Sequence, residues 1–325
     1  MMKSNTYKIA LIGAGALGSR YLQGIASSDL DAELYIVDPS VEAINVCYER
    51  ISEVNPSYNF DKIINLESVD KLPLKLDLVV VATTANVRWK VISDLLTCDR
   101  KVTYAILEKV LFQKEIEYAD CEALLNAKNV RAWVNCPRRL VPIYNKLKNV
   151  VSGGLREVFV TGGEWGLASN AIHFIDIISF ISGSDDISIL ACDISNPSGS
   201  ISKRPNFYET VGSVTGTCGD VKFTFSSENG RGSSHIIHLE TDGGSITIDE
   251  IAGEVHFLRG GGGSIERFEM PFVSSLSGAL VENILLHGAC GLTPFTVSAK
   301  LHLPFIKCVN DTFKKRFDLE LCPLT

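Results

Sequence analysis

The sequence predicts an α/β fold, in which a Rossmann domain with a doubly wound parallel sheet precedes an α+β domain with a mostly antiparallel, open sheet. Two observations carry this prediction. Short apolar runs alternate with helix-like stretches as far as Val134, as in doubly wound sheets. From Arg156 onward, one helix is followed by strand-like segments whose connections are rich in Gly, Asn and Asp, which is typical of hairpins. We therefore expect one domain at residues 1–137 and a second at 138–325.

An apolar run near the N-terminus leads directly into the motif Gly13-x-Gly15-x-x-Gly18 and a helix-like stretch. This order is that of the strand, tight turn and helix start of a dinucleotide-binding unit. Gly13 allows the turn, Gly15 lets the backbone approach a pyrophosphate, and Gly18 lets the helix pack close to the strand. The helix N-terminus would direct its unpaired N–H groups at the phosphates. We expect this loop to bind a dinucleotide, with Ala16 and Leu17 among its contacts.

An acidic residue, Asp38, follows the second apolar run, twenty positions beyond Gly18. A carboxylate at this point can accept hydrogen bonds from the adenosine ribose hydroxyls and repels a 2′-phosphate. The cofactor expected is therefore NAD in preference to NADP. The alternative is that residues 38–40 form only a turn and a helix cap, but the glycine motif and its spacing favour cofactor binding.

The remaining elements follow the chain in order. In the first domain we expect helices at 41–54 and 114–127, and between them a third helix that ends near residue 96. We expect strands of this domain within 61–69 and at 76–82, 102–107 and 130–134. In the second domain we expect a helix at 168–182, strands at 187–194, 209–216, 221–226, 235–241, 245–251, 255–258 and 264–270, and final helices at 276–290 and 296–313. Residues 260–263 are expected to form a hairpin loop, because no helix follows them.

The composition predicts a soluble, cytoplasmic protein that binds neither nucleic acid nor a membrane. The formal net charge is −7 and no dense Lys/Arg block is present. Nine cysteines occur without a CxxC pair or metal-ligand spacing, which indicates reduced thiols and no metal site. No apolar segment is long enough to span a bilayer.

Several motifs, taken together and in order, point to a family. Ala82-Thr83 and Glu108-Lys109 end two of the expected strands, Arg138-Arg139-x-x-Pro142-x-Tyr144 follows, and His173-x-x-Asp176 lies on the helix at 168–182. With the glycine motif, they make the chain resemble the Gfo/Idh/MocA oxidoreductases over nearly its whole length. Members bind NAD or NADP in the N-terminal domain and a sugar or polyol against the second sheet. The resemblance implies the same ligands here, and a dimer or tetramer of this chain.

The resemblance places the catalytic roles on Lys109 and His173, which would flank the reacting carbon, and adds Thr83, Thr84 and Glu108 to the cofactor-binding residues. Read directly, an ammonium at the carboxyl end of a parallel strand lies where such sheets bind ligands, and it can stabilise negative charge on a reacting oxygen. We expect the two side chains to meet across the interdomain cleft. The alternatives are an exposed lysine and a buried histidine with a structural role.

The sequence departs from the family pattern at Val110, where proline is usual, and at Ser169, where an aspartate is usual. Asn170 and Asp176 are spaced three residues from His173 on the same helical stripe, so Asn170 can contact substrate and Asp176 can orient the imidazole.

Two further residues are candidates for substrate binding. Trp165 is expected to stack on a sugar ring or to pack in the core. Arg138 is expected to reach substrate or cofactor phosphates or to form a surface ion pair.

Three functions remain open. The first is an NAD(P)-dependent oxidoreductase acting on the CH–OH group of a sugar, polyol or nucleotide sugar, with surface-polysaccharide precursor synthesis as one suggested pathway. The second is an NAD-dependent glycosidase or epimerase in which the ring is oxidised transiently, so that NAD is not reduced overall. The third is a non-catalytic NAD-binding sensor, which the changes at Val110 and Ser169 motivate.

Overall fold

A computed structural model describes residues 6–151, 154–195, 206–230 and 232–325. By their contacts the residues group into two compact units. The first unit comprises Met1–Phe112, Ile116–Asn135 and Pro271–Phe295, and the second comprises Gln113–Glu115, Cys136–Met270 and Thr296–Thr325. Residues 271–295, which the sequence assigned to the second domain, therefore belong to the first unit.

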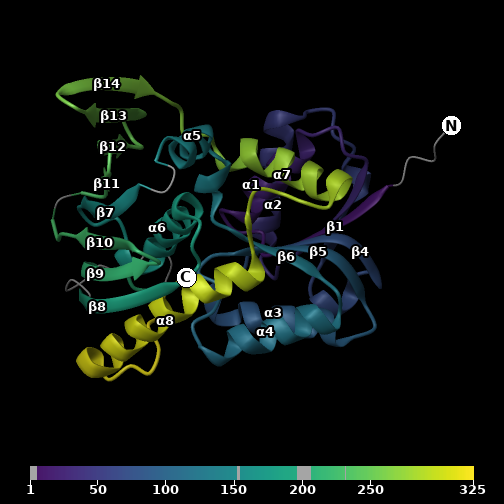
Figure 1. Cartoon of the computed structure of the whole chain (residues 1–325). Helices are drawn as coiled ribbons and strands as arrows, with labels where there is room; N and C mark the ends of the chain where they lie inside the picture. The colour runs from purple at the N-terminus through teal and green to yellow at the C-terminus, as the bar shows by residue number, and fades with distance from the viewer. Residues whose placement is uncertain (1–5, 152–153, 196–205, 231) are drawn as a thin grey trace. The chain divides into compact units, whose positions relative to one another are not determined.

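The described residues of the first unit form a seven-stranded sheet in the order β15-β6-β5-β4-β1-β2-β3 (Figure 1). The strands are β1 (Tyr7–Ile12), β2 (Ala32–Val37), β3 (Ile63–Leu66), β4 (Lys75–Val81), β5 (Lys101–Glu108), β6 (Arg131–Asn135) and β15 (Thr293–Pro294). β1 to β6 run parallel, and β15 pairs antiparallel with β6. The strand order reverses between β1 and β4, the point at which doubly wound sheets bind ligands. The predicted Rossmann architecture is confirmed.

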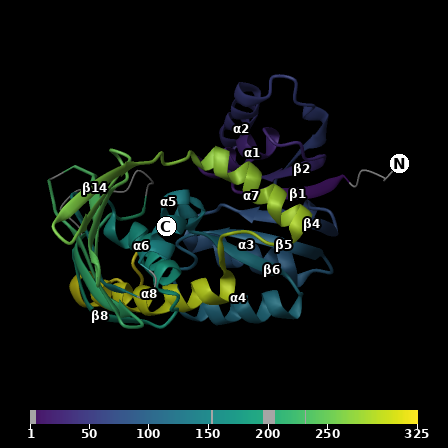
Figure 2. The same ribbon diagram turned by 45° about the horizontal axis from the view of Figure 1, so that its top comes forward.

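The helices of the first unit connect these strands. They are α1 (Gly18–Ala26), α2 (Val41–Val54), α3 (Ala85–Thr97), α4 (Ile116–Ala127) and α7 (Val273–His287), with short 3-10 turns η1 (Phe60–Lys62) and η2 (Val69–Lys71). α7 packs closely on α1 (Figure 2). A Cβ on Gly24 would collide with the carbonyl oxygen of Ser274, and one on Gly278 would lie 2.5 Å from that of Gly24. This close crossing explains why α7 belongs to the first unit, since only glycines allow the two backbones to approach so closely.

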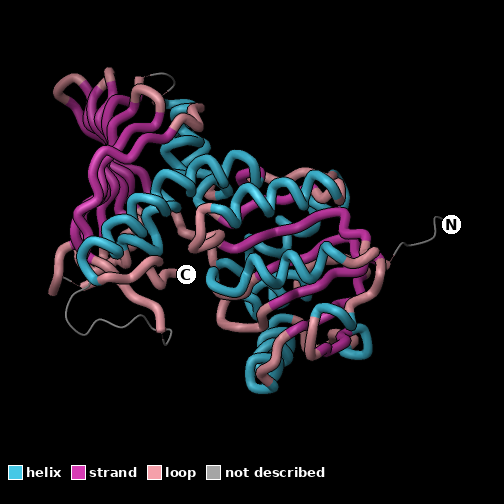
Figure 3. The backbone as a smooth tube through the Cα atoms, turned by 90° about the horizontal axis from the view of Figure 1, so that it is seen from below, coloured by secondary structure: helices cyan, strands magenta, loops and turns pink. Residues whose placement is uncertain are grey.

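The described residues of the second unit form an eight-stranded sheet in the order β14-β13-β12-β11-β7-β10-β9-β8, drawn as magenta tubes in Figure 3. The strands are β7 (Leu155–Gly162), β8 (Ile187–Ser195), β9 (Val211–Cys218), β10 (Val221–Ser227), β11 (His235–Thr241), β12 (Gly244–Asp249), β13 (Glu254–Arg259) and β14 (Gly262–Arg267). Among the described strands of this sheet, only the β7–β10 pair is parallel. The mostly antiparallel sheet was predicted, but its central strand, β7, was not.

Helix α6 (Leu167–Ser182) covers one face of this sheet (Figure 2). Alternate strand residues such as Val158 and Phe225 are fully buried on that face, whereas the opposite face carries partly exposed side chains such as Phe159 and Thr224. The unit also contains η3 (Pro137–Leu140), α5 (Pro142–Val150) and most of α8 (Phe295–Phe317). The apolar residues that alternate along these strands therefore pack largely within the unit itself.

Gly260 and Gly261 join β13 to β14 with φ angles of +51° and +88°, so a hairpin turn is present as predicted. It is shorter than the predicted loop at 260–263, because Gly262 and Gly263 pair with β13 as part of β14. Among the helices of the described residues, none combines the length and apolar character needed to cross a bilayer.

Candidate active site

The register of the parallel sheet brings several predicted site residues to one edge. Ile12, the last residue of β1, pairs with Val37 of β2 and with Val81 of β4. Glu108 at the end of β5 likewise pairs with Asn135 of β6. The glycine loop, Asp38, Thr83 and Lys109 directly follow these strand ends, so they share the carboxyl edge of the sheet, where ligands of such folds bind.

The glycine loop has a different steric requirement at each of its three glycines. Gly13 has a φ of +95°, and a Cβ there would lie 2.9 Å from the backbone of Ala82 and Thr83. A Cβ on Gly18 would collide with the carbonyl oxygen of Gly13. A Cβ on Gly15 would meet no atom within 4 Å. Gly13 and Gly18 are therefore needed by the fold itself, whereas Gly15 leaves open space that suits a pyrophosphate.

Replacing Gly15 with alanine should leave the fold intact and weaken NAD binding roughly tenfold or more, because the new methyl group fills only the space assigned to the cofactor. Thermal unfolding and NAD titration of the same preparation would check this. The matched control is Gly18→Ala, for which we expect a loss of stability of several °C. Unchanged NAD affinity in Gly15→Ala would contradict the assignment of this loop.

Asp38 has a structural role in addition to the one that the sequence predicts. Its Oδ2 accepts a hydrogen bond from the Ala14 amide at 2.6 Å, and its Oδ1 accepts one from the Ser40 amide at 2.8 Å. The turn anticipated as an alternative is therefore present. Because a carboxylate has about four acceptor positions, Asp38 retains capacity to accept hydrogen bonds from a ribose.

Replacing Asp38 with asparagine should weaken NAD and relatively favour NADP by about tenfold, since the repulsion of a 2′-phosphate is removed while an amide oxygen can still accept one backbone hydrogen bond. Asp38→Ala should have the same direction and also lower stability by about 1 kcal/mol, because the Ala14 amide loses its acceptor. Titrations with both cofactors measure the effect. Tighter binding of NADP than of NAD by the unchanged protein would refute the proposed preference.

Thr83 and Thr84 follow β4. The hydroxyl Oγ1 of Thr83 is buried and has no hydrogen-bond partner in the described part of the chain. Burying an unsatisfied polar group costs about 1–3 kcal/mol, so a polar ligand group that bonded this hydroxyl would bind favourably. Thr84 precedes the first turn of α3 and makes no capping hydrogen bond with its side chain. The donor set at this edge therefore fits a dinucleotide.

Arg88 of α3, which the sequence analysis did not select, joins two strand ends. The residue is 1% exposed, and its guanidinium donates to the carbonyl oxygens of Thr83, Val110 and Leu111, the last at 2.7 Å. These bonds tie the segment after β4 to the turn that carries Lys109, whose own side chain is half-buried. The peptide bond between Lys109 and Val110 is cis. The sequence signal that could have identified Arg88 is a charged residue on the buried face of an amphipathic helix.

Glu108 is buried among protein partners. Its Oε1 accepts hydrogen bonds from the Tyr21 hydroxyl at 2.9 Å and from the Asn135 amide at 2.7 Å. Burial raises the pKa of Glu108 above its ordinary value, although these hydrogen bonds and the charge of Arg88 oppose the shift. Glu108 thus connects α1, β5 and β6 and fixes the strand end next to Lys109. Its predicted contact with the cofactor remains a prediction.

In the second unit, the first turn of α6 carries the predicted polar stripe. The helix begins after Gly166, which has a φ of +74°. Ser169, Asn170 and His173 are spaced by three and four residues, so they share one face. The Asn170 amide donates to the Trp165 carbonyl oxygen at 2.7 Å, and His173 is half-buried.

Asp176 is fully buried, and its carboxylate pairs with Arg139 at 2.7 Å and 3.0 Å. This pairing neutralises Arg139, and orientation of His173 by Asp176 remains a prediction. Trp165 is 6% exposed and packs edge-on against Phe174, as the core alternative expected.

Arg138 forms a buried ion pair rather than the surface pair that was considered. Its Nε and Nη2 donate to the two carboxylate oxygens of Glu250 at 2.8 Å and 2.7 Å, and its guanidinium lies over the Phe174 ring. The Tyr144 hydroxyl and His235 also bond Glu250. This network joins η3, α5 and β11, so Arg138 is engaged within the unit.

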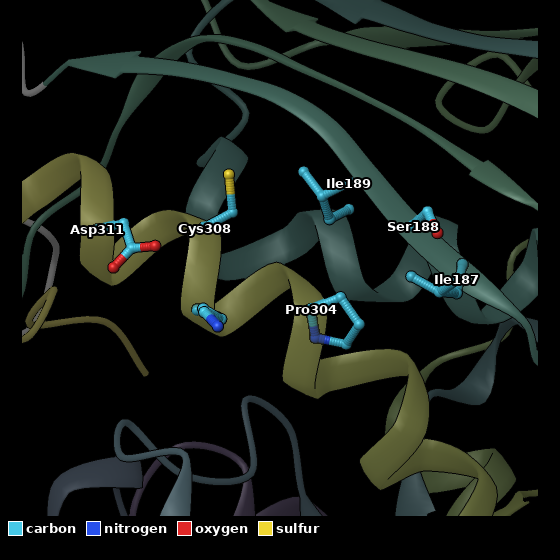
Figure 4. A pocket seen from close by; sticks show the side chains of 7 residues that line it. Ile187, Ser188, Ile189, Pro304, Cys308 and Asp311 are labelled. Atoms are coloured by element: carbon cyan, nitrogen blue, oxygen red, sulfur yellow. The ribbon is translucent and has the colours of Figure 1, made fainter.

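A pocket of about 360 Å³ lies between β8 and α8 (Figure 4). Its lining includes Ile187 and Ile189 of β8 and Cys308 and Asp311 of α8. None of the predicted site residues lines it. Within the described ranges, no group of three or more His, Cys, Asp and Glu side chains could hold a metal ion.

Several solved structures share this architecture. UDP-N-acetylglucosamine 3-dehydrogenase GnnA from Acidithiobacillus ferrooxidans superimposes with a TM-score of 0.71 at 13% identity, covering 97% of this chain and 98% of GnnA. The chain has the Gfo/Idh/MocA fold. Biliverdin reductase from Synechocystis shares this fold with a TM-score of 0.71 at 11% identity, covering 93% of this chain and 97% of the reductase.

The Gfo/Idh/MocA fold also occurs in a transcriptional regulator, Gal80p from Kluyveromyces lactis, with a TM-score of 0.71 at 15% identity over 97% of this chain and 94% of Gal80p. The sequence matches no protein-family model and no curated protein. These likenesses therefore establish the fold, and the residues of the site must carry the argument for function.

Proposed function

We propose that the chain is an NAD-dependent oxidoreductase that acts on the CH–OH group of a sugar, polyol or nucleotide sugar. The observation that carries this proposal is the glycine loop, whose open Gly15 lies at the same sheet edge as Asp38, Thr83 and Lys109. The likeness to GnnA, a UDP-N-acetylglucosamine 3-dehydrogenase, supports a nucleotide sugar within this class.

In this proposal each part of the site has a defined task. Residues 13–18 hold the pyrophosphate, Asp38 holds the adenosine ribose, and Thr83 bonds a polar group of the cofactor. A bound nicotinamide supplies the hydride acceptor or donor. Lys109 hydrogen-bonds the reacting oxygen and stabilises its negative charge, and His173 takes or returns the hydroxyl proton.

The test is an assay of NADH formation with a panel of sugars, polyols and nucleotide sugars, and of NADH consumption with the corresponding ketones. Net NADH formation with one of these substrates would support the dehydrogenase. An epimerised or hydrolysed product without net NADH formation would instead support the alternative of transient oxidation. Absence of any reaction in a protein that binds NAD would contradict both.

A non-catalytic sensor is a second candidate, because the fold is shared with the transcriptional regulator Gal80p and because Ser169 and Val110 depart from the family pattern. It predicts that NAD binds without turnover of any substrate on the panel. It also predicts that Lys109→Ala and His173→Ala leave the response of the sensor to NAD unchanged, whereas Gly15→Ala abolishes this response.

We also propose that the protein is cytoplasmic, because all nine cysteines are free thiols.

We further propose that the protein forms a homodimer or tetramer through the face of the second sheet opposite α6. Phe159 lies on that face beside His238. Phe159→Lys should lower the molar mass measured by light scattering at micromolar concentration. A monomer in the unchanged protein would contradict the assembly.

A further inference from the structure

Glu209 brings a carboxylate to the first turn of α6 from a segment forty residues beyond Ser169. Its Oε2 accepts a hydrogen bond from the Ser169 hydroxyl at 3.1 Å. A Cβ at Gly166 would collide with this carboxylate oxygen and would lie 2.9 Å from both Ser169 Oγ and Asn170 Nδ2. The three polar groups therefore surround a position that only glycine can occupy.

The backbone next to Glu209 is tied to the same turn. The carbonyl oxygen of Thr210 accepts a hydrogen bond from the Leu167 amide at 3.2 Å, and its hydroxyl accepts one from the Ala168 amide at 2.9 Å. On the other side, the Tyr208 amide donates to the carbonyl oxygen of Pro323 at 2.9 Å. The amino-terminal end of a helix favours a negative charge. Glu209 is thus held at the amino-terminal end of α6.

Ser169, which bonds this carboxylate, lies one helical turn before His173. Ser169 precedes His173 by four residues, and residues at this spacing lie on one helix face with about 5–6 Å between their Cβ atoms. The acidic residue that α6 itself contributes on this stripe, Asp176, is paired with Arg139. Glu209 therefore supplies a second acidic group, next to the Ser169 end of the stripe.

Near Glu209, the buried thiol of Cys322 has a pKa that burial and the charge of Glu209 raise. Other charged and titratable groups that neighbouring elements bring toward α6 have partners of their own. Arg138 of η3 and Tyr144 of α5 bond Glu250, and Lys148 of α5 lies over the Phe180 ring. His235 of β11 also bonds Glu250, Arg139 of η3 bonds Asp176, and Cys218 of β9 bonds the Ser184 carbonyl oxygen.

We propose that Glu209 is a positioning residue for His173, stabilising its protonated imidazole through the hydrogen-bonded first turn of α6. When His173 accepts the proton of a substrate hydroxyl, the O–H bond breaks, an N–H bond forms on the imidazole, and the new positive charge is attracted by the carboxylate. This inference rests on the proposed function, because it assigns Glu209 a role toward His173 as acid and base.

The direct test measures the charge state of His173 without any substrate. Labelled histidine signals are followed by NMR against pH, and the His173 signal is identified by its loss in His173→Ala. Because a nearby negative charge favours the imidazolium, Glu209→Gln should lower the measured pKa of His173 by roughly one. Glu209→Asp should retain most of the effect, and Glu157→Gln, an acid on β7 of the same unit, should show none. An unchanged pKa of His173 in Glu209→Gln overturns the proposal.

Kinetics provide the second readout. Glu209→Gln should lower kcat about tenfold with little change in KM, and should move the acidic limb of the pH profile to lower pH. Ser169→Ala should also lower kcat and move the acidic limb of the pH profile to lower pH, because it removes the hydroxyl that holds the carboxylate. If His173→Ala loses turnover while Glu209→Gln retains the rate and pH profile of the unchanged protein, Glu209 has only a structural role. If no substrate reacts at all, the proposed function fails, and the NMR titration still decides the role of Glu209.

Discussion

Replacing Lys109 with alanine should lower the turnover number by roughly a hundredfold or more, the usual range for the loss of a positioned acid or base. NAD affinity should change little, because Lys109 is assigned to the reacting oxygen and not to the cofactor phosphates. The half-buried side chain follows β5 directly, and Glu108 and Arg88 fix the backbone on both sides of it. Steady-state kinetics and NAD titration of the same variant measure both quantities.

Two further variants separate the possible roles of Lys109. Lys109→Arg keeps the positive charge but carries a group that does not lose its proton in proteins. It should restore turnover only if Lys109 acts through its charge alone. The matched control is Lys101→Ala, an exposed lysine at the other end of β5, for which we expect the rate of the unchanged protein. Full activity in Lys109→Ala would end the assignment.

His173→Ala should show a similar loss, with His256→Ala, a half-exposed histidine on β13, as its control. Asn170→Ala should have a smaller effect, because a neutral amide can orient a substrate but cannot take a proton at neutral pH. The order of these effects distinguishes a proton-transfer role from general damage to the first turn of α6.

The six parallel strands of the first unit and the helix after β2 could be predicted because their signals are local. The glycine loop, the β-branched run of β4 and the acidic end of β2 each specify their own structure, and the predicted helix at 41–54 coincides with α2. The same locality explains why Gly13 and Gly18 have the steric roles that the motif implies. Patterns of this kind need no knowledge of distant contacts.

The elements and contacts that the sequence did not reveal depend on distant parts of the chain. In β7, Arg156 and Glu157 interrupt the apolar pattern, and the strand is specified by pairing with β10 and β11. Helix α5 was missed although Pro142 at its start is a recognised signal. The proximity of Glu209 to Ser169 joins segments forty residues apart. No spacing rule connects such residues.

The same limit applies to the ion pairs of the second unit. Arg138 could be identified as a charged residue of interest, but its partner Glu250 lies 112 residues further along the chain. The sequence therefore left open whether this arginine serves a ligand or the fold. The contacts of Arg138 favour a structural role, and this role has a measurable consequence for stability.

Replacing Glu250 with glutamine should destabilise the protein by about 3 kcal/mol at pH 7, because removing one partner leaves the buried guanidinium of Arg138 without its counter-charge. The carboxylate side chain is 7% exposed and bonds Arg138, Tyr144 and His235 together. The matched control is Glu266→Gln, whose partner Lys146 is half-exposed and whose loss should cost at most about 1 kcal/mol. Urea unfolding of the three proteins measures the difference.

The pH dependence of this effect follows from the pKa of Glu250. Burial alone would raise that pKa, but the charge of Arg138 and the hydrogen bonds from His235, Arg138 and Tyr144 outweigh burial and hold it well below the usual range. A carboxyl whose pKa is lower in the folded state stabilises the fold above its unfolded pKa of about 4.3 and loses this contribution as the pH falls further. The difference in stability between the unchanged protein and Glu250→Gln should therefore be largest near pH 7 and shrink below about pH 4. A difference that stays constant from pH 7 to pH 3 would show that the hydrogen bonds of Glu250, rather than its charge, stabilise this network.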